Sequence, residues 1–169
     1  MKLRDTVLAE HSKAQTSKIV KWIGNSQERF NELFKLFLND EYRVTQRAAW
    51  PLSYAVKNHP ELIRRHLGKL IKNLEKKGLH DSVKRNSVRI LRDLDIPERY
   101  HGQVMNTCFR FIESPDEAVA IKAFSLIILE KLLPQYPDIK NELKLIIEER
   151  WEYEKPAFRG RAKKILKNL

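Results

Sequence analysis

A repeated pair of positions constrains this chain more than any other feature. The first position of each pair is valine or phenylalanine, and the second, four residues later, is small. The pairs are Val44/Ala48, Val83/Ser87, Val119/Ala123 and Phe158/Ala162, at spacings of 39, 36 and 39 residues. A period of this length with two apolar segments per unit is typical of stacked helical hairpins, because a single hairpin cannot bury its own apolar face. Function is then expected in the outward-facing residues of successive repeats.

Hydrophobic periodicity predicts that the whole chain is helical. Apolar residues return every three or four positions almost throughout, and no alternating strand pattern is present. Turn formers and prolines interrupt this period at intervals, for example at Gly24, Gly78 and Ser114-Pro115. We therefore expect an all-α fold, a right-handed α–α superhelix of about four helical hairpins with an N-terminal capping segment. The single domain 1–169 would comprise a cap, 1–24, and repeats at 25–60, 61–97, 98–137 and 138–169.

The second helix of each predicted hairpin resembles the HEAT/armadillo-like superfamily. HEAT units commonly carry an acidic residue in the turn, then valine, a basic residue, and alanine four places after the valine. The segments that carry the resemblance begin at Asp40 (DEYRVTQRAA), His80 (HDSVKRNSV) and Asp116 (DEAVAIKAF). The basic residue beside the valine is replaced by Thr45 and Ala120 in two units. The resemblance implies a binding or scaffold protein, since HEAT-like proteins are mostly adaptors.

The net charge limits the class of partner, and the cysteine content limits the cellular compartment. The sequence has 33 Lys and Arg against 22 Asp and Glu, a formal net charge of +11 that favours polyanionic partners. The one cysteine, Cys108, lies on an apolar helical face and is expected to be a buried thiol. No apolar run reaches membrane-spanning length and the N-terminus does not resemble a signal peptide, so we expect a cytoplasmic protein without membrane insertion.

Candidate contact residues follow from the repeat. At about 100° per residue, positions two, three, six and nine places after each aligned residue lie on the side of the second helix away from its partner. The best candidates are basic or aromatic residues on this side, with their close neighbours. They are Arg43, Arg47, Trp50, Tyr54, Arg85, Asn86, Arg89, Arg92, Lys122, Arg161 and Lys164.

Two of these groups have specific chemistry. The stripe Arg85, Arg89, Arg92 places guanidinium groups about one turn apart, where each could bind a phosphate or carboxylate; it could equally be a solvated face balanced by nearby aspartates. Trp50 precedes Pro51, and a proline inside a helix leaves the carbonyl four residues earlier without its donor. This predicts a polar niche beside Arg43, Arg47, Trp50 and Tyr54, unless Trp50 is buried between repeats.

The second helix of the third repeat is apolar on almost every side. Such a helix is expected to be buried all round. Ile121 and Ile128 are therefore either covered by packing or another subunit, or exposed as an apolar interaction patch. The sequence is therefore compatible with a homo-oligomer.

Motifs for catalysis are absent from the sequence. We find no phosphate-binding glycine loop, nucleophile elbow or zinc-ligand spacing, and expect neither a cofactor nor a metal site. The leading hypothesis is a non-catalytic binding module for a protein or polyanionic macromolecule. The alternative is a nucleic-acid-binding protein related to the HEAT-like DNA alkylation-repair glycosylases. A small-molecule enzyme is the third reading.

Overall fold

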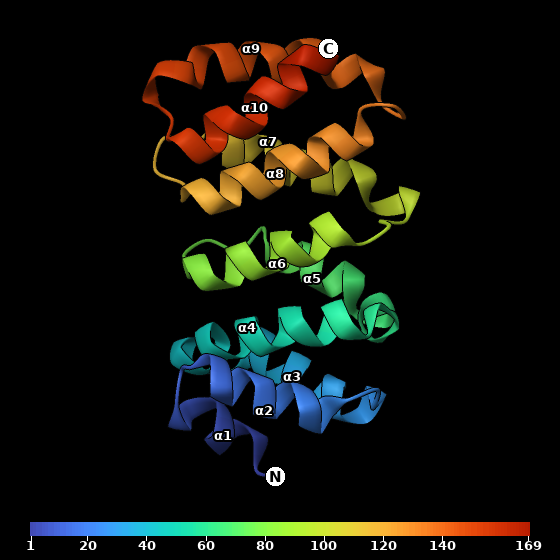
Figure 1. Cartoon of the computed structure of the whole chain (residues 1–169). Coiled ribbons are helices and arrows are strands. Elements are labelled where there is room, and N and C mark those ends of the chain that lie inside the picture. Colours follow the sequence, from blue (N-terminus) through green and yellow to red (C-terminus); the bar gives the residue numbers. More distant parts are fainter. The chain divides into compact units, whose positions relative to one another are not determined.

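The protein is entirely helical in its regular structure (Figure 1). The computed structural model describes residues 1–169. The α-helices are α1 (Leu3–Ala9), α2 (Lys13–Ile23), α3 (Gln27–Asn39), α4 (Tyr42–Asn58), α5 (Leu67–Asn73), α6 (Asp81–Asp93), α7 (His101–Glu113), α8 (Val119–Leu132), α9 (Lys140–Arg150) and α10 (Pro156–Asn168). Short 3-10 helices occupy Pro60–His66, Glu98–Tyr100, Pro137–Ile139 and Trp151–Tyr153. The predicted all-α class is confirmed.

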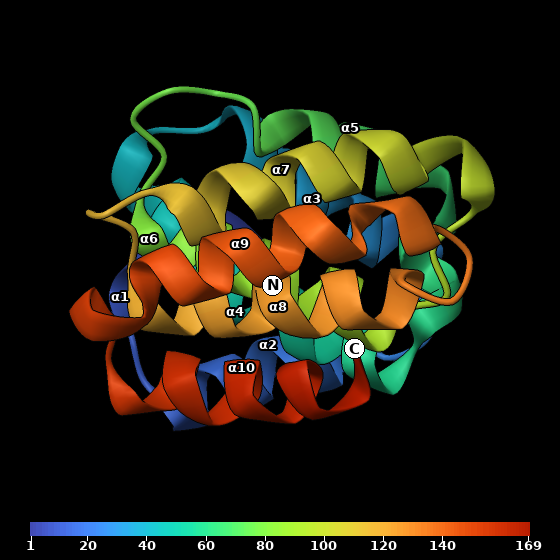
Figure 2. The same cartoon turned by 90° about the horizontal axis from the view of Figure 1, so that it is seen from above.

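The chain divides into two compact units, Met1–Leu94 and Asp95–Leu169. In the first unit, α2, α4 and α6 form one layer and α3 and α5 the other (Figures 1 and 2). In the second unit, α8 and α10 lie in one layer, with α7 and α9 behind them (Figures 1 and 2). No helix is both long enough and apolar enough to span a lipid bilayer.

The core of the first unit forms around α4. This helix packs against α3 on one side and against α6 on another. The predicted stripe of α3 is buried: Phe30, Leu33, Phe34 and Phe37 are at most 2% exposed. Small buried residues on the second helices, Ala48 on α4 and Ser87 on α6, let the helices approach closely.

Local signals set the ends of the helices that matter for the site. The Ser12 hydroxyl accepts a hydrogen bond from the Gln15 amide at 3.1 Å and begins α2. Gly24 ends α2 with φ of 51°, a left-handed conformation that glycine adopts without strain. At the start of α6, His80 Nδ1 accepts from the Ser82 amide at 2.9 Å.

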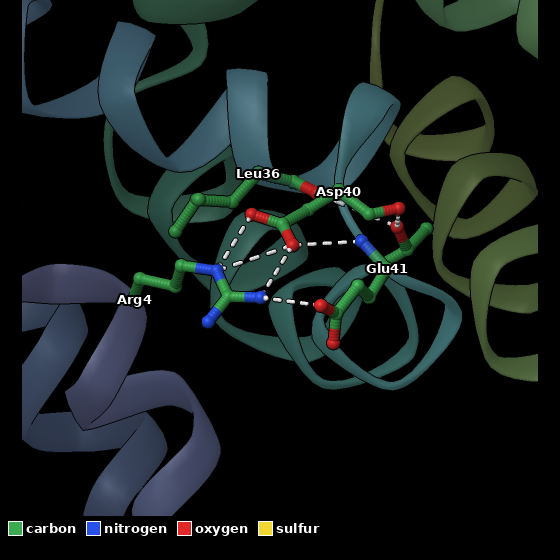
Figure 3. A network of polar contacts seen from close by, with 5 residues as sticks. Arg4, Leu36, Asp40 and Glu41 are labelled. Carbon is green, nitrogen blue, oxygen red and sulfur yellow. Dashed lines mark hydrogen bonds and ion pairs between the residues drawn. The ribbon is translucent and has the colours of Figure 1, made fainter.

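An ionic clasp holds α1 to the turn between α3 and α4. Arg4 Nε donates to Asp40 Oδ2 at 3.0 Å and Arg4 Nη2 donates to Asp40 Oδ1 at 2.9 Å (Figure 3). The same guanidinium lies 3.4 Å from Glu41 Oε1. The Arg4 hydrogen bonds, helped by the Glu41 amide, hold the pKa of the Asp40 carboxyl below its usual range. Because Arg47 on α4 also donates to the carbonyl of Leu8, α1 is fixed at two points, to the turn before α4 and to α4 itself.

The register of the third repeat differs from the predicted one by two residues. Val119 and Ala123 are only half-buried, whereas Ile121 and Ser125 are completely buried. Val119 is the first residue of α8, so the core-facing position comes later in that helix. The aligned core residues are therefore Val44, Val83, Ile121 and Phe158, followed four places on by Ala48, Ser87, Ser125 and Ala162. Ser125 satisfies its buried hydroxyl by donating to the Ile121 carbonyl at 2.8 Å.

The two alternatives for the apolar third repeat are thereby resolved. Ile121 and Ile128 are both 0% exposed. They belong to the core, and no interaction patch forms from them. The new register explains this, because it moves both residues from the outward side of the helix to the inward side.

Candidate functional site

Five of the predicted contact residues line one pocket between α4 and α6. Trp50 and Tyr54 come from α4, and Arg85, Asn86 and Arg89 come from α6. His11 and Ser82 complete the lining, and the pocket volume is about 310 Å³. Residues four apart on a helix lie on the same side, so two packed helices present Trp50/Tyr54 and Arg85/Arg89 as facing pairs.

One wall of this pocket is a row of aromatic rings. The Trp50 ring lies edge-to-face with His11 at 5.6 Å between centroids, and with Tyr54 at 6.4 Å. Trp50 is half-buried, and Tyr54 is 37% exposed. His11 was not predicted, because it comes from the turn between α1 and α2 and reaches Trp50 only through the docking of α1. Local periodicity carries no signal for such a contact.

The floor of the pocket is polar and buried. Asn86 Nδ2 donates to the Ser82 carbonyl at 2.7 Å, and Ser82 Oγ donates to the Gln46 carbonyl on α4 at 3.2 Å. Ser53 Oγ lies 3.0 Å from Asn86 Oδ1. Asn86 is only 2% exposed, so its main role is to join α6 to α4 under the pocket. Arg89 Nη1 donates to Asn86 Oδ1 across a long 3.5 Å contact, which directs this arginine over the floor.

The proline in α4 does not create the predicted niche. α4 remains helical from Tyr42 to Asn58 through Pro51. Trp50 and Tyr54 line the pocket, while Arg43 is exposed elsewhere on the helix. The Arg47 guanidinium is bound to the Leu8 carbonyl. Of the four residues predicted around the niche, only the two aromatic ones therefore belong to the site.

The pocket is positively charged. Its lining contains Arg85 and Arg89 and no carboxylate. Arg85 is exposed and forms no ion pair. The prediction that this part of α6 could bind an anion therefore stands, and the alternative of a face balanced by aspartates does not apply to Arg85.

A second pocket of about 580 Å³ adjoins the first and shares Tyr54 and Arg89 with it. Lys57, Arg92 and Asp93 lie among its other lining residues. Here the balanced-face alternative holds for Arg92, because its Nε lies 2.7 Å from Asp93 Oδ1. We call the two adjoining pockets the α4–α6 groove. The part of the groove without a carboxylate in its lining is thus the pocket that contains Arg85.

Two of the three predicted cations of the second unit, Lys122 and Arg161, form ion pairs inside the protein. Lys122 is 1% exposed, and its Nζ lies 2.5 Å from Glu154 Oε1, which also accepts from Arg150 Nε at 2.9 Å. Arg161 is bound to Glu130. Lys122 is therefore unavailable to a partner and Arg161 is already paired, while Lys164 is exposed on α10. The shifted register of α8 accounts for Lys122, since it follows the buried Ile121 directly.

The structure contains neither an activated cysteine nor a cluster of metal-binding side chains. Burial raises the pKa of the Cys108 thiol to about 12, and a thiol in this state is a poor nucleophile at neutral pH. No group of three or more histidine, cysteine or acidic side chains is placed to hold a metal ion.

Comparison with known families identifies the repeat. The HEAT repeat domain family matches residues 3–169, nearly the whole chain. No match was found among curated proteins or among solved structures. The resemblance noted in the sequence is therefore confirmed at the level of the family.

Proposed function

This chain belongs to the HEAT repeat family, and we propose that it is a non-catalytic module that binds a negatively charged macromolecule in the α4–α6 groove. The family supports a general binding or scaffold role. Proteins are the usual partners of HEAT repeats. Our proposal adds the location and the charge of the site. The cytoplasm is the compartment we propose, since the single cysteine is an unpaired, buried thiol.

One observation carries this proposal: Arg85 and Arg89 line a pocket that contains no carboxylate. A guanidinium can bind a carboxylate or phosphate through two parallel hydrogen bonds, which are stronger than bonds between neutral groups. An arginine that is paired within the protein gains little from a further anion. Arg85 has no such pair, so a partner's anion would meet a cation that is ready to bind it.

Charge reversal tests the proposal. The variant Arg85→Glu/Arg89→Glu should lose the partners that the wild-type protein retains in affinity purification. The matched control is Arg64→Glu/Arg65→Glu, which reverses two exposed arginines of the 3-10 helix Pro60–His66 in the same unit. Loss of the same partner from the groove variant only would support the site. Equal recovery with all three proteins would refute it.

Nucleic acid is the second candidate ligand, and the aromatic row favours it. Trp50 and Tyr54 stand beside the arginines, and aromatic rings stack on nucleobases. Base excision is not part of this proposal, because the pocket holding Trp50 has no carboxylate in its lining. The groove is proposed as a binding site alone.

A further inference from the structure

We infer that the ligand of the α4–α6 groove is single-stranded nucleic acid, with bases stacked on Trp50 and Tyr54 and phosphates bound by Arg85 and Arg89. This inference rests on the proposed function, because it uses the same groove. It goes further by choosing one chemical class among negatively charged macromolecules. The choice follows from the two rows of side chains in the groove.

The first argument is the pairing of an aromatic row with a cationic row. His11, Trp50 and Tyr54 form the aromatic row at centroid separations of 5.6 and 6.4 Å. Arg85 and Arg89 form the cationic row, one helical turn or about 6 Å apart. A polynucleotide carries a flat base and a charged phosphate in every unit, and proteins that bind single strands combine these two kinds of side chain. An acidic peptide would use the cationic row alone.

The second argument concerns the faces of the bases. In a duplex, each base is stacked between its neighbours and has no free face for a side chain. Tyr54 is 37% exposed and Trp50 is half-buried at the pocket wall, so ring surface is available only to an unpaired base. The aromatic row therefore selects a single strand.

The third argument is the size of the charged region. Trp50 and Lys57 at the two ends of the groove are seven residues apart on α4, or about 10 Å. Arg92, at the far end, is paired with Asp93, and the phosphate contacts that we propose are Arg85 and Arg89, which line the pocket beside the aromatic row. The groove should thus hold about two or three nucleotides and neutralise about two phosphates.

A direct binding experiment can separate the ligand classes. Fluorescence anisotropy would be measured with labelled dT10, with a 10-mer of the same backbone that lacks bases, and with a labelled Glu10 peptide. Stacking contributes about 1–3 kcal/mol per base, so dT10 should bind at least about fivefold more tightly than the abasic strand. With two phosphates neutralised, raising the salt from 50 to 200 mM should weaken dT10 binding about sevenfold. Labelled rU10 would show whether RNA is bound as well as DNA.

Two groove variants identify the contacts. Trp50→Leu keeps an apolar side chain but removes the ring, and should abolish the preference for dT10 over the abasic strand. Arg85→Gln/Arg89→Gln should weaken both strands and make binding nearly independent of salt. Matched controls are Trp22→Leu, a half-buried tryptophan on α2 with Arg29 at 5.1 Å, and Arg64→Gln/Arg65→Gln. Circular dichroism and thermal unfolding would confirm that every variant is folded.

The outcomes distinguish this inference from the proposed function. Binding of dT10 or rU10 that depends on Trp50 and on both arginines, but on neither control pair, would establish the inference. Equal binding of dT10 and the abasic strand, or an unchanged Trp50→Leu variant, would overturn stacking. If Glu10 binds through Arg85 and Arg89 and both oligonucleotides fail, the inference is wrong and the proposed function survives. If no probe binds, neither oligonucleotide nor peptide, both are overturned.

Discussion

The contact between successive second helices differs in chemistry between the two units. In the first unit, Ser53 on α4 meets Asn86 on α6 through an uncharged hydrogen bond of 3.0 Å. In the second unit, Glu130 on α8 meets Arg161 on α10 as an ion pair. Counted from the aligned core residues, Ser53 and Glu130 occupy the same repeat position, and so do Asn86 and Arg161. The same repeat positions thus join the second helices by a neutral hydrogen bond in the first unit and by an ion pair in the second.

A second repeat position shows the same contrast. An acidic residue stands four places before the aligned residue at Asp40 in the first unit and at Glu117 and Glu154 in the second, and we compare Asp40 with Glu154. The Asp40 side chain is 18% exposed and clasps Arg4, whereas that of Glu154 is 5% exposed and binds Lys122 and Arg150. The second unit therefore uses its cations to hold its helices together. The first unit links α4 to α6 through Ser53 and Asn86, which carry no charge, and we propose that Arg85 beside them contacts the ligand.

The comparison of repeat positions between the two units depends on the shifted register of α8. Truncation of the Ile121 side chain is the strongest test of that register. Ile121 is 0% exposed, so Ile121→Ala should destabilise the protein by about 3–4 kcal/mol through lost burial and the cavity left behind. Val119→Ala, at the half-buried position first predicted to be the core residue, should cost less than about 1 kcal/mol. Chemical denaturation measures both. A larger loss for Val119→Ala would restore the register predicted from the sequence.

Removing a buried cation should cost far more than removing a groove cation. Lys122→Met leaves Glu154 buried with Arg150 as its remaining partner, and should destabilise the protein by about 3 kcal/mol. Arg85→Gln should change the unfolding free energy by less than about 0.5 kcal/mol, because Arg85 is exposed and unpaired. The double variant Lys122→Met/Glu154→Leu should recover most of the loss. Similar losses for Lys122→Met and Arg85→Gln would remove the distinction between structural and ligand-binding cations.

The neutral link should contribute more to stability than its charged counterpart. Asn86→Ala removes a buried amide that bonds the Ser82 carbonyl and lies beside Ser53, so we expect a loss of about 2 kcal/mol. Arg161→Gln breaks a pair whose side chains are 29% and 24% exposed, and should cost about 1 kcal/mol or less. Urea unfolding of the two variants gives the order. The reverse order would mean that charge strengthens this link.

The clasp between Arg4 and Asp40 should give the smallest effect, and that effect should be present near neutral pH and lost in acid. Since the folded-state pKa of Asp40 is depressed, its contribution to stability is present above the unfolded pKa and is lost as the pH falls through the folded one. Arg4→Met should return the Asp40 pKa toward its model-compound value of 3.8, as followed by NMR titration of the carboxyl carbon. Arg4→Met should lower the stability slightly near neutral pH, and this loss should vanish as the pH falls through the folded-state pKa of Asp40. An Asp40 titration that is the same in both proteins would show that the clasp does not form in solution.

Much of the fold could be predicted because the core follows local periodicity. The apolar stripe on α3 recurs at helical spacing, Val44, Val83 and Phe158 recur at the repeat period, and all of these residues are buried. The prediction failed on α8, which is apolar on nearly every side, so that periodicity could not show which side faces the core.

The site was predictable to the extent that its residues share one helix face. Trp50, Arg85 and Arg89 were predicted from their outward positions after the aligned valines, and Tyr54 was predicted from the proline that follows Trp50. Lys122 was misplaced because its partner Glu154 is 32 residues away, and His11 was missed because it reaches Trp50 through the docking of α1. Contacts between distant segments decide these cases, and no local pattern contains them.

The clasp at Arg4 also connects the N-terminal helix to the ligand. With seven residues, α1 is too short to persist as an isolated helix in water, so its order depends on its attachment to α4. The turn that follows α1 carries His11, which forms part of the pocket wall. Ordering of α1 should therefore favour ligand binding in the groove, and ligand binding should favour ordering of α1 by the same free energy. In this way a salt bridge outside the proposed groove would tune the affinity of the groove for its ligand.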